Sequence, residues 1–189
     1  MRSTIIFSLV LVLSLLNASE DIIEESDENS NISSNTCSVP NKVIEAIAKI
    51  ERHAKRPIGY PYIIAFNSQD EASIVKTSLG KDLFLDWRTI DCKNETLCVK
   101  ILSYITHDHK FNNLDLGSFQ INYKHHQMPV EQYFSFEKSY FKACGFLEKL
   151  IQKNGYSWET IARYHSSTPQ FNYAYLQKIS KTMKETHYD

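Results

Sequence analysis

The sequence predicts a mainly helical domain of the α+β class with a few short strands. Apolar residues recur at helical spacings of three and four over residues 38–54 and 136–153, which predicts two amphipathic helices. Short aromatic and β-branched stretches, residues 57–67 and 84–88, have a composition that favours strands. A chain of 189 residues, of which 42% are hydrophobic, is long and apolar enough to form one sizeable core.

Residues that cap helices divide the rest of the chain into further elements. Ser68 and Glu71 have the spacing of a capping box, and Gly80 would end the helix that they start. Asn94 and Ser157 each precede a periodic apolar stretch and are expected to cap its first turn. The additional helices are therefore expected at residues 68–80, 94–109, 158–165 and 170–183, with a helical turn at 129–134.

The first residues have the pattern of a secretory signal peptide. Arg2 precedes the apolar run from Ile5 to Leu16, and the small residues Ala18 and Ser19 follow it. The run is short for a membrane span, so we expect a signal peptide of residues 1–18 that is cleaved after Ala18. An uncleaved membrane anchor is the alternative. The mature protein is then expected in the periplasm or outside the cell.

Residues 19–36 are expected to form a flexible acidic leader, followed by one folded domain at residues 37–189. The leader holds six acidic residues and no basic ones, among several Ser and Asn. Residues 1–36 account for one of the 21 Lys and Arg residues and six of the 22 Asp and Glu residues, so the domain carries a net charge of about +4. That charge is too small to predict nucleic-acid binding, and it fits a polyanionic polymer such as a carboxylate-bearing cell wall.

Four cysteines, Cys37, Cys92, Cys98 and Cys144, remain after cleavage. An even number in a secreted chain favours disulfides, for which three pairings are possible. We favour Cys92 with Cys98, which closes a short loop, and Cys37 with Cys144, which ties the start of the domain to a later helix. A zinc site is the competing interpretation, but the chain has no Cys-x-x-Cys pair and its histidines are scattered.

Glu51 is a candidate general acid because of its place on the first predicted helix. It shares one face with Ile44, Ile47 and Ala48 through helical spacing, so its carboxyl group is expected to face the core. Loss of water there would raise its pKa, as a general acid near neutral pH requires. A position at the edge of the apolar face, with an ion pair to a neighbouring base, is the alternative.

The stretch Leu114–Asn122 is a candidate cleft lining. Gly117 permits a turn or a close backbone approach, and Gln120 and Asn122 alternate with Phe119 and Ile121. That alternation suits a segment whose apolar residues anchor it while its amides face a polar ligand. A plain turn followed by a strand is the alternative.

Other aromatic and histidine residues carry weaker signals. Tyr60 and Tyr62 could form a platform for sugar rings, although buried packing is the commoner role of such residues. The pairs His107 and His109, and His125 and His126, do not have spacings that bring two imidazoles to one helix face, so no metal site is expected there.

Three segments in order carry a resemblance: residues 47–51 (IAKIE), 115–122 (DLGSFQIN) and 161–166 (IARYHS). Together they resemble the lytic transglycosylase family with a goose-lysozyme-like fold, and are most similar to the small specialised transglycosylases of bacterial secretion and conjugation machines. The resemblance covers residues 43–179 and implies a lysozyme-like domain. The sequence departs from the family pattern in three ways. Arg52 follows Glu51 where a small residue is usual, His165 replaces an Asn, and the segment between Glu51 and Asp115 is long and holds the loop from Cys92 to Cys98.

The resemblance implies a role for each site residue. Glu51 would be the catalytic acid and base. The substrate-binding residues would be Gln120, Asn122 and Tyr164, with Tyr60, Tyr62, Tyr123 and His165 as secondary candidates. Asp115 and Gly117 would be structural, with Asp115 bracing the turn at Gly117. No metal or organic cofactor is implied.

The implied reaction cleaves the bond between N-acetylmuramic acid and N-acetylglucosamine in peptidoglycan and leaves a 1,6-anhydromuramic end. The expected partners are peptidoglycan strands and components of a secretion or conjugation machine, with no nucleic acid, and the protein is expected to be a monomer. One alternative is hydrolysis by a goose-type lysozyme-like muramidase, with Asp86, Asp108 or Asp115 activating water. Another is a catalytically weak glycan-binding or assembly protein.

Overall fold

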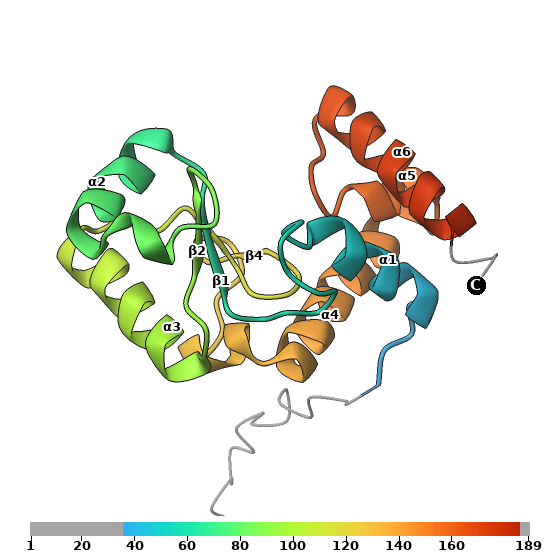
Figure 1. The fold of residues 1–189 in the computed structure, drawn as a ribbon. Coiled ribbons are helices and arrows are strands. Elements are labelled where there is room, and N and C mark those ends of the chain that lie inside the picture. The colour runs from blue at the N-terminus through green and yellow to red at the C-terminus, as the bar shows by residue number, and fades with distance from the viewer. Residues whose placement is uncertain (1–35, 186–189) are drawn as a thin grey trace, which may run out of the picture. The chain divides into compact units, whose positions relative to one another are not determined.

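Helices dominate the fold, and a small antiparallel sheet lies among them (Figure 1). The computed structural model describes residues 36–185, which belong to one compact unit, Ser34–Asp189. The predicted signal peptide, and all of the predicted leader except Thr36, lie outside the described residues. The α+β class with a mainly helical content is therefore confirmed for the described part of the chain.

Thirteen elements follow one another along the described chain. Their bounds are α1 Asn41–Glu51, β1 Ile63–Phe66, α2 Gln69–Leu79, η1 Lys81–Leu83, β2 Thr89–Asp91, α3 Glu95–Ser103, η2 Tyr104–Asp108, β3 Leu114–Leu116, β4 Ile121–Asn122, η3 Val130–Phe134, α4 Phe136–Asn154, α5 Trp158–Ala162 and α6 Pro169–Glu185. The helices of residues 36–185 include none with both the length and the hydropathy of a membrane span.

The predicted caps begin their helices. The Ser68 hydroxyl accepts a hydrogen bond from the backbone N–H of Glu71, at 3.3 Å, before α2. The Asn94 side chain accepts one from Leu97 before α3, and the Ser157 hydroxyl accepts one from the third residue of α5. Each bond satisfies a backbone donor that has no partner inside its own helix, which explains why local sequence sets these boundaries.

One strand lies later in the sequence than expected. Residues 84–88 were predicted to be extended, whereas β2 begins at Thr89 and Phe84 contributes only an isolated bridge to Ile90. The Asp86 carboxylate explains the difference, because it accepts hydrogen bonds from the backbone N–H groups of Arg88 and Thr89 and so closes a turn.

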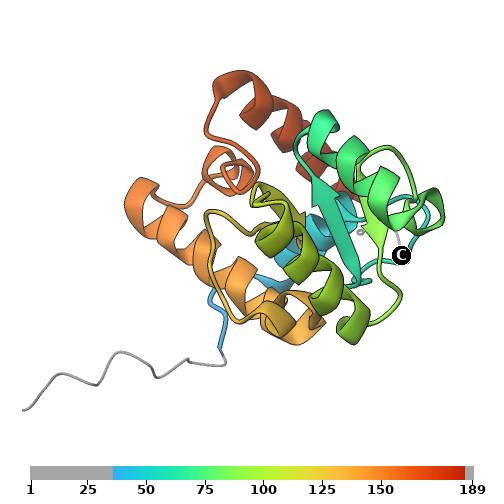
Figure 2. The ribbon, with the colours of Figure 1, turned by 90° about the vertical axis from the view of Figure 1, so that its left-hand side faces the viewer.

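The four strands pair in the order β2-β1-β3-β4, all antiparallel. All four residues of β1 are buried, and Ile64 pairs with both Ile90 and Leu116. The helices α2 and α3 contact β1, and Figure 2 views the molecule from their side. A second group of helices packs together through contacts of α6 with α1 and α5, and of α4 with α1 and α5. The sheet side and the helical side of the site described below come from these two groups.

Both predicted disulfides are present. Cys37 bonds to Cys144 with a Cα–Cα distance of 5.9 Å, and so joins the residues before α1 to the middle of α4. Cys92 bonds to Cys98 with a Cα–Cα distance of 4.9 Å, between the end of β2 and α3. Two disulfides fit a protein that folds outside the cytoplasm.

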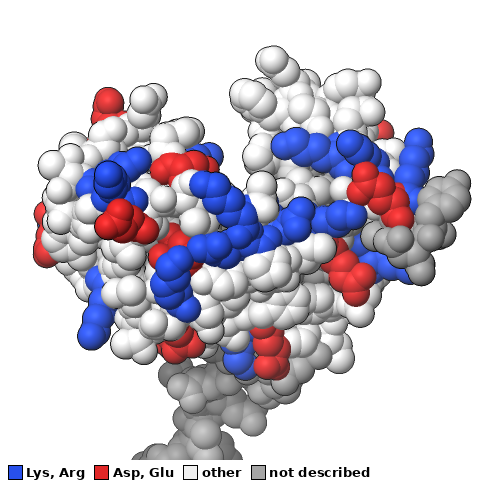
Figure 3. Space-filling view, in the orientation of Figure 1, with Lys and Arg blue, Asp and Glu red and all other residues white. Residues whose placement is uncertain are grey.

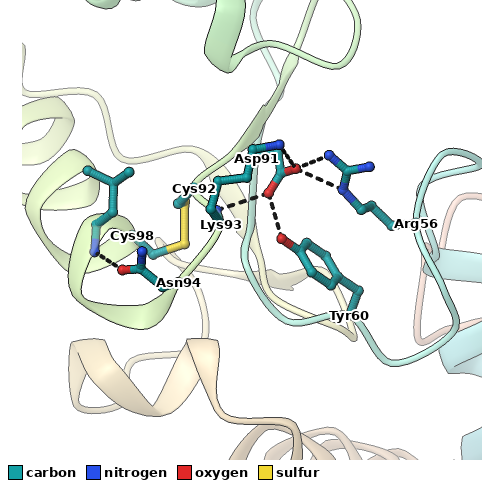
Figure 4. The surroundings of a disulfide bond; sticks show 8 residues. Arg56, Tyr60, Asp91, Cys92, Lys93, Asn94 and Cys98 are labelled. Carbon is teal, nitrogen blue, oxygen red and sulfur yellow. Dashed lines mark hydrogen bonds and ion pairs between the residues drawn. A yellow bond between two sulfur atoms is a disulfide. The ribbon is translucent and has the colours of Figure 1, made fainter.

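The Cys92–Cys98 disulfide lies beside a cluster of charged groups around the buried Asp91 (Figure 4). The Asp91 carboxylate accepts hydrogen bonds from Arg56, from Lys93 and from the Tyr60 hydroxyl, the last at 2.7 Å. Burial alone would raise the pKa of Asp91, but the donors from Lys93, Arg56 and Tyr60 outweigh it and lower the pKa to about 2. The cluster therefore fixes the chain after α1 against the end of β2.

Candidate functional site

A cleft of about 650 Å³ lies between the sheet side and the helical side of the unit. Figure 3 shows the hollow between the part that carries α2 and the part that carries α5 and α6. The segments that line the cleft are the end of α1, β1, the start of β2, the β3–β4 hairpin with residues on either side of it, the middle of α4 and the connection from α5 to α6. The cleft thus collects residues from six separate parts of the sequence.

Glu51 is the last residue of α1, and it lines the cleft. Ile44, Ile47 and Ala48 on the same helical face are buried, as their spacing predicted. Desolvation by burial is the largest influence on Glu51 and raises its pKa from 4.5 to about 7. Within residues 36–185, Glu51 forms no ion pair, so the alternative of a base beside it does not hold.

Tyr175, from α6, is the direct partner of Glu51. Its hydroxyl donates a hydrogen bond of 2.6 Å to Glu51 Oε1. Burial has the largest effect on the pKa of Glu51 and raises it. The hydrogen bond from Tyr175 has the second largest effect and lowers the pKa, and the charge of Asp115 raises it. Glu51 is therefore held in one orientation while it remains able to exchange a proton near neutral pH.

The hairpin turn between β3 and β4 requires glycine at Gly117. Its φ is +71°, and a Cβ atom there would lie 2.0 Å from the backbone oxygen of Tyr133. Gln120 also has a positive φ, of 47°, and its side-chain N–H donates a hydrogen bond of 2.9 Å to the oxygen of Gly117. A residue other than glycine in this conformation is strained, and Gln120 lines the cleft.

Asn122 and Asp115 both line the cleft and bond to each other. The Asn122 amide donates hydrogen bonds of 2.9 Å to Asp115 and 3.0 Å to Asn113. Arg88 donates to the second oxygen of Asp115 at 3.3 Å. Both N–H groups of Asn122 are thus used within the hairpin, and Asp115 braces Asn122 and Arg88 rather than the Gly117 turn.

Tyr164 and His165 line the helical side of the cleft. The Tyr164 hydroxyl donates a hydrogen bond of 2.8 Å to the backbone oxygen of Phe119, and burial raises its pKa well above the ordinary value. The His165 ring stacks on Tyr175, with centroids 4.9 Å apart and planes at 6°. His165 therefore contacts the residue that holds Glu51.

Three predicted tyrosines do not line this cleft. The Tyr60 hydroxyl donates a hydrogen bond to Asp91, and Tyr60 borders a water-sized pocket of about 10 Å³ beside Glu51. Tyr62 packs edge-on against Tyr60, with centroids 5.4 Å apart. Tyr123 packs near Tyr133, with centroids 5.8 Å apart. Their hydroxyl and ring contacts make them parts of the framework around the cleft.

Sequence reasoning missed Tyr175 and Arg88. The only signal for Tyr175 was its spacing of four from Ile179, which puts both on one helical face, and both are in fact buried. Arg88 had no signal, because its partner Asp115 is 27 residues further along the chain.

Metal ligands are not gathered at the cleft in the described part of the chain. Among residues 36–185, the one group of side chains close enough to share an ion is Cys37, Cys144 and Glu148. The two cysteines form a disulfide, so their sulfur atoms are not available as thiolate ligands.

We compared the chain with protein families, with characterised proteins and with solved structures. None of the three comparisons gives a match.

Proposed function

We propose that this protein is a peptidoglycan lytic transglycosylase with a lysozyme-like domain, and that Glu51 is its single catalytic acid and base. The observation that carries the proposal is the state of Glu51: a carboxyl group with a pKa of about 7, held by Tyr175 at the side of a cleft of about 650 Å³. A group with this pKa can both give and take a proton near neutral pH.

The other carboxyl group in the cleft supports a mechanism with one acid rather than two. Among the described residues only Glu51 and Asp115 supply carboxyl groups to the cleft. Both oxygens of Asp115 accept hydrogen bonds, one from Asn122 and one from Arg88. The other two candidates for activating water, Asp86 and Asp108, do not line the cleft. Hydrolysis in which a second carboxylate activates the water would need such a group to be free, and both oxygens of Asp115 are already bonded.

In the proposed reaction Glu51 first gives its proton to the glycosidic oxygen, and the bond from that oxygen to C1 of the muramic residue breaks. The acetamido group of the same sugar stabilises the positive charge that develops at C1. Ionised Glu51 then takes the proton of the C6 hydroxyl group as O6 bonds to C1. The product is a 1,6-anhydromuramic end, Glu51 recovers its proton, and no water is consumed.

Gln120 and Tyr164 are the proposed positioning residues for the glycan. Both line the cleft, and both have side-chain bonds to backbone oxygens, of Gly117 and Phe119 respectively, which fix their orientation. Fixed polar groups orient a substrate at little entropic cost. Asn122 supports this surface through the hairpin. The periplasm is the proposed compartment, because it holds the substrate and permits disulfides.

The test is digestion of purified peptidoglycan with the disulfide-bonded protein, followed by mass spectrometry of the fragments. We expect anhydromuramic ends, and we expect the Glu51→Gln variant to produce none. Glu45→Gln, on the exposed face of the same helix, is the matched control and should retain activity. Reducing ends would instead identify a muramidase, and undiminished activity of Glu51→Gln would refute the assignment of the acid.

A further inference from the structure

Cationic side chains outnumber carboxyl groups around the cleft. The cations that line it are Arg52, Arg88, Lys142 and Arg163, and the carboxyl groups are those of Glu51 and Asp115. Figure 3 shows Lys and Arg side chains in a band across this face of the molecule, beneath the hollow. An excess of positive charge in a cleft attracts anionic ligands.

Two of the four cations already have partners in the protein. Arg88 donates hydrogen bonds to Asp115 at 3.3 Å and to Asn67 at 3.2 Å. Lys142 donates one of 2.7 Å to the backbone oxygen of Gln127. These groups hold the sides of the cleft in position, and their charge is partly satisfied.

The other two, Arg52 and Arg163, are exposed, and within residues 36–185 their guanidinium groups have no hydrogen-bond or ion-pair partner. Arg52 directly follows Glu51 at the end of α1, and Arg163 directly precedes Tyr164 at the end of α5. Both α1 and α5 pack against α6, so both arginines belong to the helical side of the cleft. A guanidinium group presents a planar set of donors that matches a carboxylate.

We propose that Arg52 and Arg163 form a carboxylate-binding site on the helical side of the cleft, through which the protein selects carboxylate-bearing glycan strands over neutral ones. This inference rests on the proposed function and names the feature of the substrate that the cleft recognises. Peptidoglycan offers such carboxylates from two sources. One is the lactyl group of a muramic residue without its stem peptide, and the other is the stem peptide itself.

The experiment measures binding of three glycans to the Glu51→Gln variant, which should leave the strands uncut. The glycans are a neutral oligomer of N-acetylglucosamine, peptidoglycan strands stripped of stem peptides by an amidase, and strands with intact stems. We expect tighter binding of at least one carboxylate-bearing strand than of the neutral oligomer. Adding Arg52→Gln or Arg163→Gln should weaken that binding about tenfold and leave binding of the neutral oligomer unchanged.

Two controls separate this effect from charge in general. Lys100→Gln removes an equal charge from the exposed side of α3, outside the cleft, and should leave all three affinities unchanged. Arg52→Lys keeps the charge but loses the planar donor pair, and should retain only part of the preference. Thermal unfolding of each variant, carried out first, would show that it is folded.

The outcomes distinguish the sources and the hypotheses. Loss of affinity for stripped strands identifies the lactyl carboxylate, and loss for stem-bearing strands alone identifies the peptide. Equal affinity for all three glycans, no binding of any of them, or a loss that includes the neutral oligomer, would overturn the inference. If the wild-type protein cleaves strands without any charge preference, only this inference fails. If charge-selective binding occurs but the wild-type protein cleaves nothing, only the proposed enzymatic function fails.

Discussion

Replacing Glu51 by Gln should stabilise the protein above about pH 4.5, with the full effect at neutral to alkaline pH. The folded protein raises the pKa of this carboxyl group from 4.5 to about 7 through burial, so ionising it costs more in the folded state than in the unfolded chain. Below pH 4.5 the carboxyl group is protonated in both states and costs nothing. The cost grows as the pH rises from 4.5 to 7 and is constant above that range. Each pKa unit corresponds to ~1.4 kcal/mol, so a rise from 4.5 to about 7 makes ionised Glu51 lower the free energy of unfolding by about 3 kcal/mol.

Urea unfolding of the wild-type protein and the variant at pH 4, 5.5, 7 and 8.5, with disulfides intact, measures this cost. The two free energies of unfolding should agree at pH 4 and differ by about 3 kcal/mol at pH 8.5, in favour of Glu51→Gln. The Gln side chain keeps an oxygen that can accept a hydrogen bond from the Tyr175 hydroxyl. The difference between the two proteins therefore reports the charge of Glu51. Glu45→Gln, on the exposed face of α1, should show no pH-dependent difference. A constant difference at every pH, or a more stable wild type at pH 8.5, would refute the desolvation of Glu51 and with it the reason for choosing it as the acid.

Three further predictions concern the partner of Glu51, the hairpin and a disulfide. Tyr175→Phe removes the donor that lowers the pKa of Glu51, so glycan cleavage should persist to higher pH in a pH–rate profile. Gly117→Ala puts a methyl group 2.0 Å from a backbone oxygen and should cost about 3 kcal/mol or more in urea unfolding, whereas Gly145→Ala, at an open helical position, should gain about 0.5–1 kcal/mol. Cys144→Ser opens a link between residues 107 apart and should cost about 5 kcal/mol, measured by urea unfolding without reductant.

Predictions made from local sequence agree with the structure where a single segment decides the outcome. The buried face of α1 could be predicted because Ile44, Ile47 and Ala48 repeat at the helical period. Glu51 occupies the next position on that face and must point the same way. The helix starts at Ser68 and Asn94 could be predicted because a capping side chain hydrogen-bonds to the backbone of the first turn of its own helix. The disulfides agree for a different reason: four cysteines allow three pairings, and the favoured one is present.

The sequence did not predict which side chains would hydrogen-bond to residues distant in the chain. Tyr60 was a candidate for sugar binding, but its hydroxyl bonds to Asp91, 31 residues away. Asn122 was expected to face substrate, yet its amide N–H groups are used by Asp115 and Asn113. In both cases the side chain has the right chemistry for a ligand, and a neighbour brought by the sheet takes its donors first.

By itself, the sequence determined the helical content, the caps and the inward direction of Glu51, because periodicity and turn chemistry act within a few residues. Tertiary structure alone decided that Tyr175, 124 residues away, donates to Glu51, and that Asp115 is held by Arg88. It also decided that Arg52 and Arg163 share one cleft and have no partner among the described residues. The physical reason is that periodicity shows which face of a helix or strand is buried. Which atoms meet that face depends on how elements distant in sequence pack against it.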